Sequence, residues 1–162
     1  MAEFHDHQRF IGNLSYRTAG FLLLGGVTLA VVGMLMLRYD QLAALDGAMV
    51  IALAFFMLPT QIHERYLFLV LAFVAARLAS DRALWPVFIF LTISATLNIV
   101  GDLRGFVPVA YAYIVESSLP YVLAAGNLVT LVWLLIRMIY LSLPPRVWRW
   151  RTAEVANGSK DW

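Results

Sequence analysis

The chain has 162 residues, of which 62% are hydrophobic and only 14% are charged. A soluble domain is about 45–50% apolar and about 25% charged, so the composition excludes an ordinary soluble fold and indicates an integral membrane protein. The net charge of +2 is too small for a nucleic-acid-binding protein, and the absence of cysteine excludes disulfides and thiolate metal sites.

Five apolar segments follow the polar N-terminal stretch. The first is too long for a signal-peptide core, which spans about 7–15 residues. Backbone in lipid must satisfy its own hydrogen bonds, so each crossing segment should be a helix of about 17–25 residues. The third segment is short, and prolines follow the second and the fifth, as expected at helix ends. The predicted segments are 18–37, 42–58, 64–79, 84–100 and 119–143. The sequence therefore predicts an all-α, polytopic transmembrane bundle with about five spanning helices.

The chain divides into a transmembrane region, residues 1–143, and a basic aromatic tail, residues 144–162. The tail begins with the run RVWRWR, whose arginines suit anionic lipid and whose tryptophans suit the headgroup level. Basic residues near helix ends set orientation, and a cytoplasmic C-terminus places eight of them inside and four outside. The loops near 59–65 and 101–118 are then extracytoplasmic. An outside N-terminus without a signal peptide suggests that a further segment precedes Met1.

A dense polar cluster interrupts the apolar segments in the run PTQIHERYLF, which includes Gln61, His63, Glu64 and Arg65. The arginine fork matches a phosphate group, and histidine and glutamate can move protons or hold hydroxyl groups. A helix start beside them favours an anion. The cluster predicts a site for a phosphorylated lipid headgroup or a sugar at the outer face. The alternative is an interfacial turn in which Glu64 caps a helix and pairs with Arg65, but ionisable groups at membrane depth favour function.

The second outer loop could contribute to the same site. Two carboxylates and an arginine could join the cluster in an outward-facing cleft, and aromatic rings could stack on a sugar. A solvated or interfacial loop is the simpler interpretation, and the sequence favours it. The loop residues concerned are Asp102, Arg104, Tyr111, Tyr113 and Glu116.

Other polar residues carry weaker predictions. The stretch His5 to His7 matches no zinc signature, so neither a metal nor another cofactor is predicted. Small and hydroxyl residues within the spans predict close helix packing, with a pocket role as the alternative for the two asparagines. Few charges lie centrally in the spans, which disfavours a small transporter. The packing residues are Gly26, Gly33, Thr92, Ser94, Thr96, Asn98 and Asn127.

The stretch FFMLPTQIHERYLF resembles a segment of bacterial integral-membrane glycosyltransferases of the GT-C class. It is most similar to the mannosyltransferases related to the enzyme that adds the second mannose in GPI-anchor synthesis. The match rests on Pro59, Thr60 and the run from His63 to Phe68, and the flanks LSYRTAGFLLLGG and SATLNIV agree with it. Leu69 stands where that family usually has proline, and Gln-Ile at 61–62 replaces a common basic residue and methionine. The resemblance covers residues 10–140.

The resemblance implies transfer of a sugar, mannose or another hexose, from a polyprenyl-phosphate donor to a hydroxyl acceptor with inversion, at the outer face. It places His63, Glu64 and Arg65 at the donor phosphate or the transferred sugar. Such enzymes have many more spans, and their catalytic acid lies in the N-terminal half. The resemblance therefore implies a C-terminal portion without an identified catalytic residue and inactive alone. Further substrate-binding candidates are Gln61, Tyr66, Asp102 and Arg104.

The expected partners are a lipid-linked sugar donor, membrane lipids, and a separate N-terminal half or a partner subunit, with no nucleic acid. The expected location is the bacterial inner membrane, with a cytoplasmic C-terminus. The alternative function is that of a non-enzymatic membrane subunit that binds lipid phosphate or steadies a partner enzyme.

Overall fold

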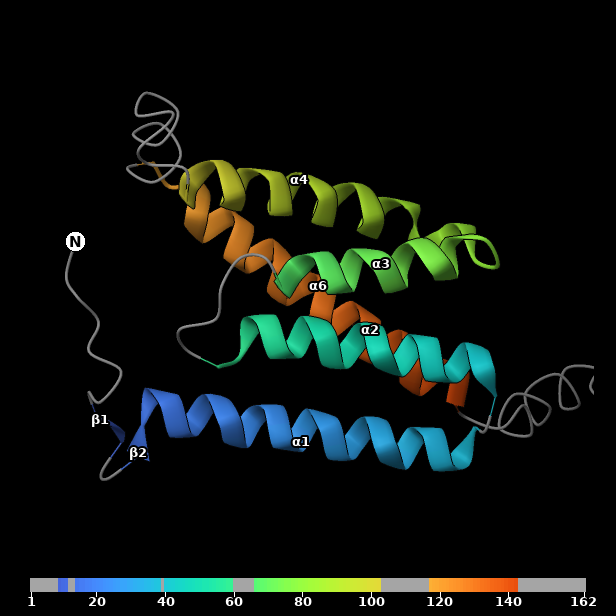
Figure 1. The fold of residues 1–162 in the computed structure, drawn as a ribbon. Coiled ribbons are helices and arrows are strands. Elements are labelled where there is room, and N and C mark those ends of the chain that lie inside the picture. The colour runs from blue at the N-terminus through green and yellow to red at the C-terminus, as the bar shows by residue number, and fades with distance from the viewer. Residues whose placement is uncertain (1–8, 12–13, 39, 60–65, 103–116, 143–162) are drawn as a thin grey trace, which may run out of the picture.

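The computed structural model describes residues 9–11, 14–38, 40–59, 66–102 and 117–142. Its main elements are five helices, and consecutive helices run in opposite directions (Figure 1). They confirm the predicted all-α bundle, with boundaries within three residues of those expected. A short 3-10 turn, η2 (Arg82–Leu84), precedes the fourth of them. The helices are α1 (Tyr16–Leu37), α2 (Gln41–Met57), α3 (Leu67–Leu78), α4 (Trp85–Asp102) and α6 (Leu119–Ser142).

Three helical stretches of the described chain are long and apolar enough to cross a membrane, namely 16–37, 82–101 and 119–142. This length and composition make the protein an integral membrane protein. The other two helices are shorter, with 17 residues in α2 and 12 in α3. At 1.5 Å per residue α3 is about 18 Å long, which is less than the bilayer core of about 30 Å. It packs against α2 and α4 within the bundle.

A two-stranded hairpin precedes α1. Its strands, β1 (Arg9–Ile11) and β2 (Leu14–Ser15), pair in antiparallel orientation. The Ser15 hydroxyl then caps α1 by accepting a hydrogen bond from the Thr18 N–H at 3.2 Å. Strands this short show no alternating pattern in the sequence, so the hairpin was not predicted.

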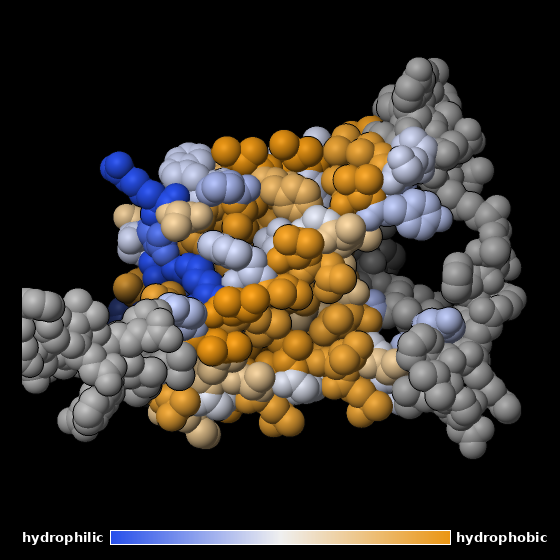
Figure 2. Space-filling model, turned by 180° about the vertical axis from the view of Figure 1, so that it is seen from behind, coloured by the Kyte–Doolittle hydropathy of each residue, from blue (hydrophilic) through white to orange (hydrophobic). Residues whose placement is uncertain are grey.

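The core forms around α2, which packs against α1, α3 and α6. Eight residues of α2 are buried, and several of them are small. Small residues let the neighbouring helices approach closely. At Gly47, for example, an added Cβ would lie 3.0 Å from Val31 Cγ1 on α1. Figure 2 shows the result from outside: apolar side chains cover most of the bundle, and hydrophilic ones gather at one end.

Two glycines mark close helix crossings. An added Cβ at Gly20 would lie 2.3 Å from the Leu58 carbonyl oxygen, so the start of α1 touches the end of α2. An added Cβ at Gly126 would lie 2.4 Å from the Phe90 ring, so α6 crosses α4 there. Real Cβ atoms do not come this close to other atoms. The Gly20 crossing therefore requires glycine, because the clash is with backbone, whereas a Cβ at Gly126 would require the Phe90 ring to move.

Candidate functional site

One end of the bundle, called here the loop end, gathers the helix termini that flank the predicted polar cluster. There α2 ends, α3 begins, α4 ends and α6 begins (Figure 1). The two stretches that carry the predicted substrate-binding residues, 58–66 and 102–118, therefore both connect helices at the loop end. The helix order thus places the helix ends that flank two polar stretches, about 40 residues apart in the chain, at the same end of the bundle.

The structure describes two of the seven predicted substrate-binding residues. Tyr66 lies at the start of α3 and is exposed, and its ring meets the Phe55 ring edge-on with centroids 5.5 Å apart. Asp102 is the last residue of α4. The Glu64–Arg65 pairing and the cleft remain predictions. The other predicted residues lie outside the described ranges: Gln61, His63, Glu64, Arg65 and Arg104, and also the loop residues Tyr111, Tyr113 and Glu116 and the stretch from His5 to His7.

The stretch from His63 to Tyr66 is called here the HERY stretch. Described contacts hold the chain on both sides of it. Before it, Leu58 N–H donates to the Ala54 carbonyl at 2.9 Å, and Pro59 is buried against the start of α1. At its last residue, the ring contact between Tyr66 and Phe55 joins the start of α3 to α2. The connection that carries the HERY stretch therefore leaves α2 and enters α3 at positions held by contacts with α1 and α2.

Of the polar residues predicted to pack helices together, Ser94 and Asn127 join α4 to α6. Asn127 Nδ2 donates to Ser94 Oγ at 3.0 Å, and Asn98 Nδ2 lies 3.4 Å from the same oxygen. Asn127 Oδ1 is buried without a hydrogen-bond partner in the described chain. In contrast, Thr92 and Thr96 bond to carbonyls of their own helix and are exposed, so they do not join helices.

The predicted packing role of Gly26 and Gly33 does not appear in the described chain. An added Cβ at either glycine would meet no atom within 4 Å. Both lie on the exposed outer side of α1, away from α2. Their spacing placed them on one face of the helix, but that face is not the one that contacts the described helices.

At the opposite end of the bundle, called here the ionic end, the structure shows a buried charge cluster that the sequence did not predict. Asp46 of α2 is only 2% exposed. Its Oδ1 accepts from Arg77 Nε of α3 at 2.9 Å and from Arg137 Nη1 of α6 at 3.1 Å. Its Oδ2 lies 3.8 Å from Arg38 Nη1, too far for a hydrogen bond. One carboxylate therefore links the ends of four helices.

Further polar groups surround this carboxylate. Arg137 also pairs with Asp81, and Arg77 Nη1 donates to Ser80 Oγ at 2.6 Å. Arg38 Nε donates to Asp40 Oδ2 at 2.8 Å. Three arginines thus face three aspartates, and their formal charges cancel. The balance indicates a structural clamp, because a binding site for an ion would present uncompensated charge.

Two carboxylates at the ionic end lie outside the spanning segments and have lowered pKa values. Burial tends to raise the pKa of Asp81, but the Ala83 N–H and the Arg137 guanidinium outweigh burial and lower it. The Ala43 N–H, at 2.6 Å, lowers the pKa of Asp40, with a smaller contribution from Arg38. Both groups therefore remain charged well below neutral pH.

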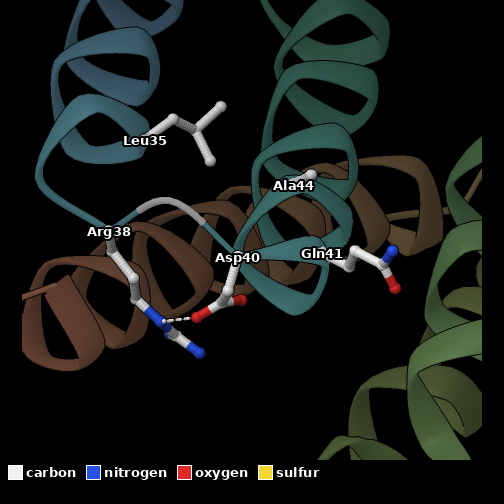
Figure 3. A pocket seen from close by; sticks show the side chains of 5 residues that line it. All are labelled: Leu35, Arg38, Asp40, Gln41 and Ala44. Atoms are coloured by element: carbon white, nitrogen blue, oxygen red, sulfur yellow. Dashed lines mark hydrogen bonds and ion pairs between the residues drawn. The ribbon is translucent and has the colours of Figure 1, made fainter.

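A hollow of about 440 Å³ lies beside the cluster, between the end of α1 and the start of α2. Figure 3 shows that Arg38 points toward Asp40 within it. Asp40 also caps α2, so the helix start and the guanidinium are both neutralised by the same carboxylate. The hollow therefore offers no free positive charge to an anion. Its lining residues are Leu35, Arg38, Asp40, Gln41 and Ala44.

The sequence contained one signal for the cluster. Asp46 is a single carboxylate within an otherwise apolar segment, LAALDGAMVIALAFFML, and such a residue requires a partner. In five antiparallel helices Arg77 and Arg137 fall at the same end as Asp46. The positions of the arginines indicated the orientation of the chain, but their pairing with Asp46 was not predicted.

Within the described residues, no group of three or more His, Cys, Asp and Glu side chains is placed to hold a metal ion. Comparisons with protein families, curated proteins and solved structures found no match to the chain. The fold and its membrane character therefore rest on the chain's own sequence and geometry.

Proposed function

We propose that the chain is the membrane-embedded portion of a glycosyltransferase that uses a polyprenyl-phosphate-linked hexose, and that it binds this donor at the loop end. The resemblance of PTQIHERYLF to GT-C mannosyltransferases supplies the reaction class. One structural observation supports the location: the helix order brings the HERY stretch and the Asp102 end of α4 to the same end of the bundle (Figure 1).

The start of α3 supports an anionic ligand. No described side chain caps this helix at Tyr66. The first N–H groups of a helix carry partial positive charge and favour a phosphate. Arg65 immediately precedes them in the chain, and the exposed Tyr66 ring is held by Phe55. In the proposal, the donor phosphate lies against this helix start, with Arg65 as its principal cation.

The proposed orientation places the loop end outside the bacterial inner membrane and the C-terminus in the cytoplasm. The clustering of Arg38, Arg77, Arg82 and Arg137 at the ionic end supports it, because basic residues are retained on the cytoplasmic side. The chain has no cysteine, so single cysteines can report the sides. A membrane-impermeant thiol reagent added to intact cells should label Ser118→Cys and leave Ala83→Cys unlabelled.

Donor binding and sugar transfer are expected to reside in different parts of the enzyme. The resemblance places the catalytic acid in an N-terminal half, so the chain alone should bind a lipid-linked sugar and transfer nothing. Transfer of mannose from a polyprenyl-phosphate donor by the purified chain would contradict this part of the proposal.

The binding test compares polyprenyl phosphate with the corresponding polyprenol, using the purified chain in nanodiscs. The phosphate form should bind more tightly, and Arg65→Ala should weaken its binding at least tenfold, because hydrogen bonds to charged groups contribute about 1.5–3 kcal/mol. Arg17→Ala, an exposed arginine near the same end, is the matched control and should change little. Equal affinity for both lipids in the unaltered chain would overturn the proposal.

A further inference from the structure

The seam between α4 and α6 opens toward the ionic end. The two helices touch where Gly126 meets Phe90, and the Ser94–Asn127 hydrogen bond lies beside this contact. Figure 1 shows α6 running away from α4 from there toward the ionic end. The divergence leaves a wedge between the first half of α4 and the middle of α6.

The wedge is an apolar hollow on the outer surface of the bundle. Its volume is about 320 Å³, near the lower end of ligand pockets, which span about 300–1,000 Å³. Its lining includes Val87, Phe90, Val129 and Trp133, of which Val129 is 68% exposed. The Thr130 hydroxyl in its wall is bonded to the Gly126 carbonyl at 2.8 Å and so needs no ligand. An apolar chain fits these walls.

A surplus positive charge adjoins the wedge in the chain, at the ionic end of the bundle. Arg82 is exposed, adjoins the lining residue Ala83, and has no ion pair within the described chain. Its neighbour Asp81 is already bound by Arg137 and by the Ala83 N–H. Arg137 lies 6.0 Å from the Trp133 ring centroid and is itself neutralised by aspartates. Among the described residues at this end, Arg82 is therefore the cation available to a ligand.

We propose that the wedge binds one acyl chain of an anionic phospholipid whose headgroup contacts Arg82. The wedge follows the helices, is apolar inside and has a free cation at the level of the helix ends, as a lipid in the adjacent leaflet requires. A transmembrane helix of another chain would also fit the apolar walls, but it would leave the charge of Arg82 without a partner. The inference does not rest on the glycosyltransferase proposal, because it concerns the opposite end of the bundle.

A second surface hollow gives a contrast within the same molecule. It lies between α1, α2 and α3, has a volume of about 350 Å³, and its lining includes Leu24, Ile51 and Phe73. As in the wedge, no charged residue lines it, but here no lining residue adjoins a charged residue in the chain either. It therefore provides no basis for choosing between anionic and zwitterionic headgroups, in contrast to the wedge.

The test is native mass spectrometry of the full chain released from detergent, titrated with phosphatidylglycerol or phosphatidylcholine. One phosphatidylglycerol should bind about fivefold more tightly than phosphatidylcholine, because one arginine near the surface contributes about that preference. Arg82→Gln should weaken phosphatidylglycerol binding about fivefold and leave phosphatidylcholine binding unchanged, whereas the matched Arg17→Gln should change neither. Ala83→Phe, at an exposed position, should fill the wedge and weaken binding of both lipids.

Each other outcome overturns the inference. Equal binding of the two lipids by the unaltered chain, or phosphatidylglycerol binding that Arg82→Gln leaves unchanged, would remove the headgroup contact. Unchanged lipid binding in Ala83→Phe, with helicity confirmed by circular dichroism, would remove the acyl chain from the wedge. A lipid-free dimer that Ala83→Phe dissociates would identify a second copy of the chain as the occupant.

Discussion

The two ends of the bundle are both polar, but they are built in opposite ways. At the ionic end the charges lie on the helices themselves, and Asp46 is buried among arginines of three other helix ends. At the loop end the predicted charges lie on connecting stretches, and the described contacts beside them are aromatic or backbone contacts. Charges that neutralise one another inside a bundle hold its helices together, whereas charges on connecting stretches can serve a ligand, which is the role proposed for the loop end.

The depth of the ionic cluster sharpens this contrast. Asp46 lies five residues inside α2 and Arg137 five residues before the end of α6, which is about 8 Å from either helix end. Charges at that depth are costly unless they are paired, which explains why each has at least one partner. The comparison predicts large stability effects at the ionic end and binding effects at the loop end.

The largest expected stability effect follows removal of the shared carboxylate. Asp46→Ala leaves Arg77 and Arg137 without their central partner, and breaking a buried pair costs about 3–5 kcal/mol. The free energy of unfolding in mixed detergent micelles, followed by circular dichroism, measures the loss. Asp40→Ala, an exposed aspartate of the same cluster, is the control and should cost less. Equal losses would show that the buried position of Asp46 does not matter.

A smaller effect is expected at the close contact between α1 and α2. Gly20→Ala places a Cβ against the backbone at Leu58, which should lower the free energy of unfolding by about 1–3 kcal/mol. Gly25→Ala is the matched control on the same helix, since a Cβ there meets nothing within 4 Å. Its stability should be unchanged or slightly higher, because alanine favours helix. Equal destabilisation by both would contradict the described contact.

The hydrogen bond between α4 and α6 should contribute less. Ser94→Ala removes the partner of Asn127 Nδ2, and such bonds between membrane helices are worth about 0.6 kcal/mol on average and at most about 1.7. Thr92→Ala removes a hydroxyl that bonds only within α4 and should have no measurable effect. Thermal unfolding of the two variants side by side separates these cases. No difference between them would show that the interhelical bond is dispensable.

The smallest expected effect is on the acid dependence of stability. Asp40 and Asp81 have pKa values below the ordinary 3.8 in the folded chain. A lowered carboxyl pKa gives stability that is fully present above the unfolded pKa and is lost as pH falls through the folded pKa. The unfolding free energy should therefore be constant with respect to these groups above about pH 5 and decline below about pH 4. In the Asp81→Asn variant, this decline should be shallower.

The positions of the helices were predictable because each is an apolar run, although the third is short. Proline follows the second run, and Ser15 and Asp40 cap the first two helices, so the boundaries are marked by local chemistry. The ionic cluster was not predictable in this way. Asp46 is 31 residues from Arg77 and 91 from Arg137, and their pairing depends on the helix order and on which faces meet.

The glycines show the same limit at a finer scale. Spacing within α1 selected Gly26 and Gly33, yet the close contacts are made by Gly20 and Gly126. Spacing identifies residues on one face of a helix, but it does not tell whether that face meets a neighbour. At the loop end, the cluster from His63 to Arg65 was selected by its chemistry and its resemblance to a family, and its role remains a prediction.

One crossed binding measurement tests the difference between the ends most directly. Arg65→Ala and Arg82→Gln each remove one arginine, and each variant is titrated with polyprenyl phosphate and with phosphatidylglycerol. We predict that Arg65→Ala weakens only polyprenyl phosphate binding, at least tenfold, and that Arg82→Gln weakens only phosphatidylglycerol binding, about fivefold. Unchanged polyprenyl phosphate binding in Arg65→Ala, or its loss in Arg82→Gln instead, would contradict the assignment of the loop end as the donor site.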